Sequence, residues 1–214
     1  MAIKSTLKNM ILVLMVVSLV ASAVLAGIFV LTKDIVEQTK NKKINEAIGL
    51  VIPGYDQATS IQVDTVLALD AKFTEKSKKN DTINNQLYFY IVKNGEKVIG
   101  TAARTFTNNG FSGHIEVMVG FDVNGNILES DVLEHHETPG LGDKTSRSVS
   151  KWNTQFNNKN PQAANFKTKK DGGEIDAITA ATISSRAYID ALKRASDAYE
   201  KYIKNKIMEE THNE

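Results

Sequence analysis

Several common sources of chemistry are missing from this chain of 214 residues, which contains no cysteine. That absence excludes disulfides, thiol catalysis and iron–sulfur clusters held by thiolates. Neither sign of charge dominates, because the chain has 26 Lys and Arg residues and 25 Asp and Glu residues, which gives a net charge of +1. We therefore expect no nucleic-acid partner. A phosphate-binding Walker loop, a dinucleotide fingerprint, a nucleophile elbow and a Ser–His–Asp pattern are also missing, and we expect no independent substrate site.

A long apolar run is the first positive feature. Residues 10–31 carry no charge, and roughly 22 residues span about 33 Å as a helix, which matches a bilayer core. Ala21-Ser22-Ala23 resembles a signal-peptidase site, but signal sequences have apolar runs of only about 7–15 residues, so we favour an uncleaved anchor. Lys4 and Lys8 indicate a cytoplasmic N-terminus. The charge bias is incomplete because four lysines follow the run, namely Lys33, Lys40, Lys42 and Lys43.

The remaining pattern predicts an α+β fold, in which one extracytoplasmic domain with an antiparallel sheet packed by helices follows the transmembrane helix. A helical pattern over 33–52 ends at Pro53-Gly54. A short strand is expected within 59–74 and a polar loop at 77–85. Turn signals at Asn94-Gly95 and Asn124-Gly125 predict a meander of four strands, over residues 86–92, 97–107, 111–121 and 127–133.

Two helices are expected to cover this sheet. The first spans 144–156, and Val149, Trp152 and Phe156 lie on one face of it. The second runs from 183 to 208 with an apolar stripe of Tyr188, Leu192, Ala195, Tyr199 and Tyr202. The predicted division is 1–32 for the cytoplasmic N-terminus and anchor, 33–58 for a juxtamembrane helix and connector, 59–208 for the domain, and 209–214 for a polar tail.

The segment from Asp176 to Ser185 is rich in small and hydroxyl residues and opens into the last helix. Backbone amides in the first turn of a helix have no partner within it, and the helix dipole favours negative charge there. Thr182 at that start could carry a phosphate as an ester. The alternative is that Thr182 or Thr179 is only an N-cap.

The segment from His135 to Lys144 forms a second informative loop. Gly140 and Gly142 allow a backbone to approach a ligand closely, and Glu137 and Lys144 place an acid and a base beside it. A metal site built from His135, His136 and Glu137 is the alternative. Adjacent side chains diverge and this spacing is not typical of metal ligands, so we expect no metal.

Together, residues 136–142 and the pattern Asp176-x-x-Thr179-Ala180-Ala181-Thr182 resemble the FMN-binding domain family of electron-transport subunits. The resemblance is to the G subunit of Rnf-type ion-translocating complexes, with the C subunit of sodium-translocating NADH:quinone reductase as a related family. The segment 111–115 resembles the strand entry of that domain. The family usually has glycine where Ala180 stands, and alanine disfavours a positive φ.

The resemblance implies that a flavin transferase attaches FMN covalently through a phosphoester to Thr182. It implies that Ser184 and Ser185 hydrogen-bond the phosphate, and that Asp176 organises the turn or binds a metal for the transferase. Lys144 would lie near the phosphate or the flavin ring. The other cofactor-binding positions that the resemblance implies are Glu137, Thr138, Leu141, Gly142 and Thr179.

The implied function is that of a membrane-anchored electron-transfer subunit, which relays electrons within an ion-translocating oxidoreductase together with the other membrane subunits of the complex. We expect it in the cytoplasmic (inner) membrane, with a single span and the FMN domain on the periplasmic or extracytoplasmic side. The alternatives are the C subunit of a sodium-translocating NADH:quinone reductase, a membrane-anchored flavin-binding sensor, or a lone flavin reductase.

Overall fold

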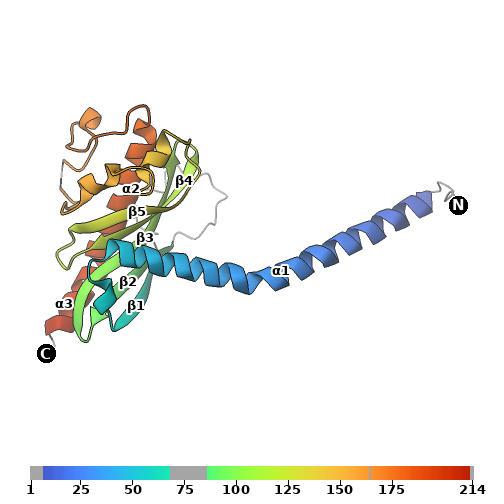
Figure 1. The fold of residues 1–214 in the computed structure, drawn as a ribbon, viewed down its shortest axis with the longest axis horizontal. Coiled ribbons are helices and arrows are strands. Elements are labelled where there is room, and N and C mark those ends of the chain that lie inside the picture. The colour runs from blue at the N-terminus through green and yellow to red at the C-terminus, as the bar shows by residue number, and fades with distance from the viewer. Residues whose placement is uncertain (1–6, 68–85, 164, 213–214) are drawn as a thin grey trace. The chain divides into compact units, whose positions relative to one another are not determined.

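The computed structural model describes residues 7–67, 86–163 and 165–212. The predicted loop at 77–85 and the end of the predicted strand, 68–74, lie outside these residues. The chain divides into two compact units, residues 1–45 and residues 46–214. Figure 1 shows a long helix in the first unit and a twisted sheet with helices in the second. This architecture confirms the predicted α+β fold.

Helix α1 (Leu7–Val51) contains the apolar run. In the described part of the chain it is the only helix that is long and apolar enough to cross a membrane, by length and composition. Its side chains between residues 10 and 31 are exposed within the chain, as a segment surrounded by lipid requires. The helix then continues without interruption into the second unit.

The sheet of the second unit is an antiparallel meander. Its five strands in the described residues lie in the order β1-β2-β3-β4-β5. Gly95 follows β2 with a φ of 61° and Gly125 follows β4 with a φ of 90°, so both predicted turns use glycine where the backbone is left-handed. The predicted strands are confirmed, with the bounds β1 Ser60–Leu67, β2 Gln86–Asn94, β3 Lys97–Gly110, β4 Gly113–Phe121 and β5 Ile127–His135.

One face of the sheet packs against helices from the C-terminal part of the chain, α2 (Thr182–Ala198) and α3 (Lys204–His212). A π-helical turn, η5 (Tyr199–Ile203), joins them. The Tyr199 ring stacks on Phe121 with centroids 5.1 Å apart. The predicted apolar stripe is correct up to Tyr199 and wrong at Tyr202, which is 40% exposed while Ile203 is buried. The wider π turn adds a residue and shifts the buried face by one position.

The other face of the sheet packs against the last turn of α1. Ile48, Val51 and Ile52 are buried there. A Cβ atom at Gly120 would collide with the Val51 carbonyl, and one at Gly100 would lie 3.1 Å from the Ile52 side chain. Glycine at these strand positions therefore permits the close approach of helix and sheet.

The predicted helix over 144–156 is wrong. The chain forms two separate 3₁₀ turns there, η2 (Gly142–Thr145) and η3 (Trp152–Phe156). Hydroxyl groups of the intervening serines bond locally, because Ser150 Oγ donates to the Lys144 carbonyl at 2.7 Å and Ser146 and Ser148 pair at 2.9 Å. Such bonds compete with helical hydrogen bonding.

Candidate functional site

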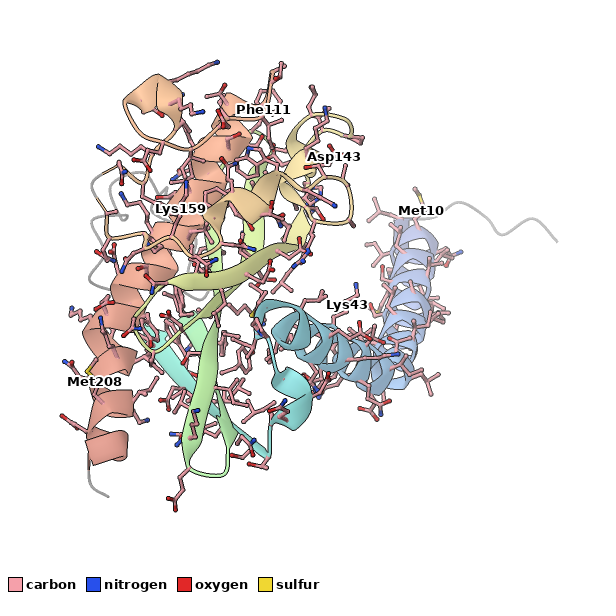
Figure 2. The ribbon with its side chains drawn as sticks, turned by 60° about the vertical axis from the view of Figure 1, so that its left-hand side comes forward. Met10, Lys43, Phe111, Asp143, Lys159 and Met208 are labelled. Carbon is pink, nitrogen blue, oxygen red and sulfur yellow. The ribbon has the colours of Figure 1, made fainter. Side chains whose placement is uncertain are left out.

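A pocket of about 280 Å³ lies where three connections of the second unit meet. They are the turn between β3 and β4, the loop after β5, and the turn leading into α2. Figure 2 places Phe111 of the first connection and Asp143, at the end of the second, at the same end of this unit. The lining residues are Phe111, Glu137, Thr138, Leu141, Gly142, Lys170, Ala180, Ala181, Thr182, Ile183 and Ser184.

The start of α2 forms the polar part of the pocket. Ala181 is the N-cap residue and provides no side-chain cap, so neither Thr182 nor Thr179 caps the helix. Thr182 is the first helical residue, and its hydroxyl accepts a hydrogen bond from Lys170 Nζ at 3.2 Å. The first-turn amides without a capping side chain and the helix dipole favour an anion beside Thr182.

The residue before the cap has a strained backbone. Ala180 has a φ of 61°, and the only other non-glycine residue with positive φ in the described residues is Asn158. A left-handed conformation costs alanine about 1–2 kcal/mol, whereas glycine adopts it freely. Position 180 therefore favours glycine on physical grounds. Ala180 adopts the same left-handed backbone, but with an unfavourable conformational energy.

Glu137 holds the walls of the pocket together. Its side chain is buried and accepts hydrogen bonds from the Ser184 hydroxyl and from the Ser112 amide, the latter at 2.9 Å. A Cβ atom at Gly142 would collide with the Glu137 carboxylate and lie 2.7 Å from Ser184 Oγ. Gly142 thus lets the loop after β5 approach α2, and Glu137 links that loop to α2 and to the β3–β4 turn.

The other predicted cofactor-binding residues divide into two groups. Thr138 and Leu141 line the pocket, whereas Lys144, Thr179 and Ser185 do not. Ser185 Oγ donates to the Ala181 carbonyl and accepts from the Ile178 amide, both at 2.9 Å. The Ser184 hydroxyl is bonded to Glu137 and the Ser185 hydroxyl to the turn before α2, so both hydroxyls are engaged within the protein.

Asp176 lies outside the pocket with an exposed carboxylate, which pairs with Lys169 Nζ at 2.7 Å. Its backbone anchors the turn, because its carbonyl accepts from Trp152 Nε1 at 2.6 Å and its amide donates to Gln155 Oε1 at 2.8 Å. The histidines of the alternative metal site form no cluster of three potential ligands in the part of the chain that the structure describes.

Five lining residues were not among the predicted cofactor-binding residues. Ala180 and Ala181 belong to the recognised turn motif, whereas Phe111, Lys170 and Ile183 were given no role in binding. Phe111 is 68% exposed and Ile183 is 48% exposed. In the sequence, Phe111 indicates only the entry of a strand and Ile183 only the start of a helix. Lys170 belongs to no sequence motif, and only the folding of the 3₁₀ turn η4 (Lys169–Asp171) against α2 brings it to Thr182.

Comparisons with known proteins agree with this geometry. Residues 110–197, which include all of the pocket lining, match the family model described as an FMN-binding domain. The G subunit of the ion-translocating oxidoreductase complex of Haemophilus influenzae is 34% identical over 183 residues, 84% of each chain. The protein of the same name from Vibrio cholerae is 31% identical over 207 residues, 95% of this chain and 92% of its own.

A solved structure shows a similar fold. The crystal structure of Shewanella oneidensis NqrC matches with a TM-score of 0.51 and 18% identity, over 71% of this chain and 85% of that one. At this level of identity the match supports the architecture of sheet and helices.

Proposed function

Because this chain belongs to the family of G subunits of ion-translocating oxidoreductase complexes, we propose that it is the membrane-anchored flavoprotein subunit of such a complex, with FMN bound covalently to Thr182. The observation that carries this proposal is the position of the Thr182 hydroxyl. It faces a pocket at the start of α2, within the region that matches the FMN-binding domain model, and a lysine lies beside it.

The residues of the pocket fit FMN. Phe111, Leu141 and Ile183 offer apolar surface for the flavin ring, while Lys170 and the first turn of α2 offer positive charge for the phosphate. FMN supplies reversible one- and two-electron redox chemistry when it is bound. At about 280 Å³, the pocket lies below the roughly 300–1,000 Å³ of sites that enclose a small molecule. Part of the flavin would remain exposed, as electron exchange with a neighbouring protein requires.

A covalent bond suits such an open site. A freely exchanging cofactor in a shallow pocket would be lost by dilution, whereas a phosphoester to Thr182 would keep it at a fixed place. The ester retains one negative charge, which the N-terminus of α2 would stabilise by roughly 0.3–1 kcal/mol. A flavin transferase would form this bond during maturation.

We further propose that α1 anchors the chain in the inner membrane with its N-terminus in the cytoplasm, since Lys4 and Lys8 precede the apolar run. The FMN-binding domain would then lie on the extracytoplasmic side. The other membrane subunits of the complex would supply and accept the electrons, and ion translocation would be a property of the assembly. The relatives in the G-subunit family favour this role over that of the C subunit of a sodium-translocating NADH:quinone reductase.

The covalent bond can be tested by intact mass spectrometry of the full-length chain produced in membranes together with a flavin transferase. We expect a mass increase equal to FMN minus water, and flavin fluorescence that survives denaturation. Thr182→Ala should abolish both signals because it removes the hydroxyl that forms the ester.

Thr179→Ala is the matched control, since it removes the other threonine of the same turn, which lies outside the pocket lining. It should retain the added mass. Flavin that persists in Thr182→Ala, or that disappears only in Thr179→Ala, would contradict the assignment.

A further inference from the structure

We propose that Lys170 is the phosphate-binding residue of this pocket and that the ion pair between Asp171 and Arg186 holds it in position. The inference rests on the proposed binding of FMN, but it does not depend on the covalent bond.

Among the described residues that line the pocket, Lys170 has the only cationic side chain. Its ammonium group lies 3.2 Å from Thr182 Oγ1, the atom to which the phosphate would be esterified. The neighbouring Lys169 is directed elsewhere and pairs with Asp176. The other ionisable residue of the lining, Glu137, has its carboxylate bonded to Ser184 and Ser112. Lys170 therefore provides the charged side chain for a ligand phosphate, beside the partial positive charge at the N-terminus of α2.

Lys170 is held in position by its own neighbour in sequence. Arg186 donates two hydrogen bonds to the Asp171 carboxylate, at 2.9 and 2.7 Å, and Thr168 Oγ1 donates a third at 2.5 Å. Thr182 and Arg186 lie one helical turn apart on the same side of α2. The consecutive residues Lys170 and Asp171 therefore contact consecutive turns of the helix, and the paired guanidinium and carboxylate fix the register.

This arrangement distinguishes two ligands that share the same ring system. FMN carries a phosphate at the end of its ribityl chain, whereas riboflavin ends in a neutral hydroxyl. A lysine ammonium acts on phosphate as a point charge, so Lys170 should strengthen the binding of FMN and leave that of riboflavin unchanged.

The test compares the affinities of FMN and riboflavin for the full-length chain in detergent, produced without a transferase and shown by intact mass to carry no flavin. We expect the unmodified chain to prefer FMN, with Lys170 contributing about tenfold of this preference, as expected for one hydrogen bond to a charged group. Lys170→Met should reduce the preference by about tenfold without changing riboflavin affinity, and Lys170→Arg should restore most of it.

Lys169→Met is the matched control, because it removes the same charge from the same 3₁₀ turn and should leave the preference intact. Asp171→Asn tests the positioning role and should lower the preference by about threefold, since it weakens the pairing with Arg186 and leaves the charge of Lys170 in place.

Three other outcomes would each decide between the role of Lys170 and the proposed FMN site. If flavins bind but Lys170→Met retains the preference for FMN, or Lys169→Met loses it equally, the role of Lys170 is refuted while the FMN pocket stands. A preserved preference without covalent flavin in the transferase experiment would refute the ester and support Lys170. If neither flavin binds to the unmodified chain, the role of Lys170 in binding a free FMN phosphate is refuted, and the mass measurement with the transferase decides separately whether FMN is attached at Thr182.

Discussion

At the scale of single residues, a strained backbone lies two residues before the proposed attachment site. Ala180 lines the pocket with a φ of 61°, a conformation that costs an alanine about 1–2 kcal/mol. The hydrogen bonds of Ser185 to both sides of the turn help to hold this conformation. Strain of this kind next to a functional residue persists only when surrounding contacts determine the backbone.

Ala180→Gly should therefore stabilise the domain. Glycine relieves the strain and loses part of this gain through the greater freedom of the unfolded chain, so we expect a net increase in unfolding free energy of about 0.5–1 kcal/mol. Urea denaturation followed by the fluorescence of Trp152, the single tryptophan of the chain, measures this quantity.

Ala177→Gly is the control, because Ala177 is half-buried in the same segment and is not among the residues with positive φ. There glycine gains nothing and should lower stability by several tenths of a kcal/mol. Equal losses in both variants would show that the backbone at Ala180 is not strained.

At the scale of elements, η4 and η5 show how short irregular turns adjust the regular parts of the domain. The π turn η5 changes the buried residue from Tyr202 to Ile203, and the hydroxyl of its first residue, Tyr199, donates to the Asp122 carbonyl at 3.0 Å. The 3₁₀ turn η4 places Lys170 against α2. In both cases a residue of the turn bonds to a segment far away in the sequence: Tyr199 of η5 to Asp122, and Lys170 of η4 to Thr182 of α2.

The attachment of η4 to α2 should depend on pH through Asp171. Hydrogen bonds from Arg186 and then Thr168 lower the pKa of the Asp171 carboxyl to about 2. A lowered pKa means that the contact is fully formed above the ordinary pKa of aspartate and is lost as the pH falls from there through about 2.

Carbon-13 NMR of the Asp171 carboxyl across this range should show a midpoint well below that of an unpaired aspartate. Arg186→Met should move the midpoint back toward the ordinary value, because it removes the first of these causes. An unchanged midpoint in that variant would show that the ion pair does not form in solution.

At the scale of the whole molecule, the end of the long helix is part of the second unit. That unit begins at Glu46, and Ile48, Val51 and Ile52 are buried against the sheet. The same continuous helix thus provides a candidate membrane span at one end and part of a hydrophobic core at the other.

Two truncations separate these roles. A chain of residues 46–214 should fold, whereas a chain of residues 53–214 loses the burial of three aliphatic side chains, each worth about 1.5–3 kcal/mol. That loss is comparable to the roughly 5–15 kcal/mol total stability of a typical domain, so the shorter chain should be unfolded or melt far lower. Circular dichroism melting curves compare the two, and equal midpoints would show that α1 is dispensable to the core.

Sequence alone determined the features that depend on local pattern. The apolar run 10–31 fixed the candidate membrane span, and the Asn-Gly turn signals at 94–95 and 124–125 fixed the hairpins of the antiparallel meander. The position of Thr182 at the start of a helix was also predicted from sequence, because a helix start depends on neighbouring residues. These predictions needed only the preferences of neighbouring residues.

Tertiary structure decided which distant residues meet. The approach of Lys170 to Thr182, the bonding of Glu137 to Ser184 and the packing of Val51 over Gly120 all join segments that no local pattern relates. The positive φ of Ala180 and the π turn after Ala198 run against local preference. Surrounding packing and hydrogen bonds impose both, because the free energy of the assembled core outweighs the preference of a single residue.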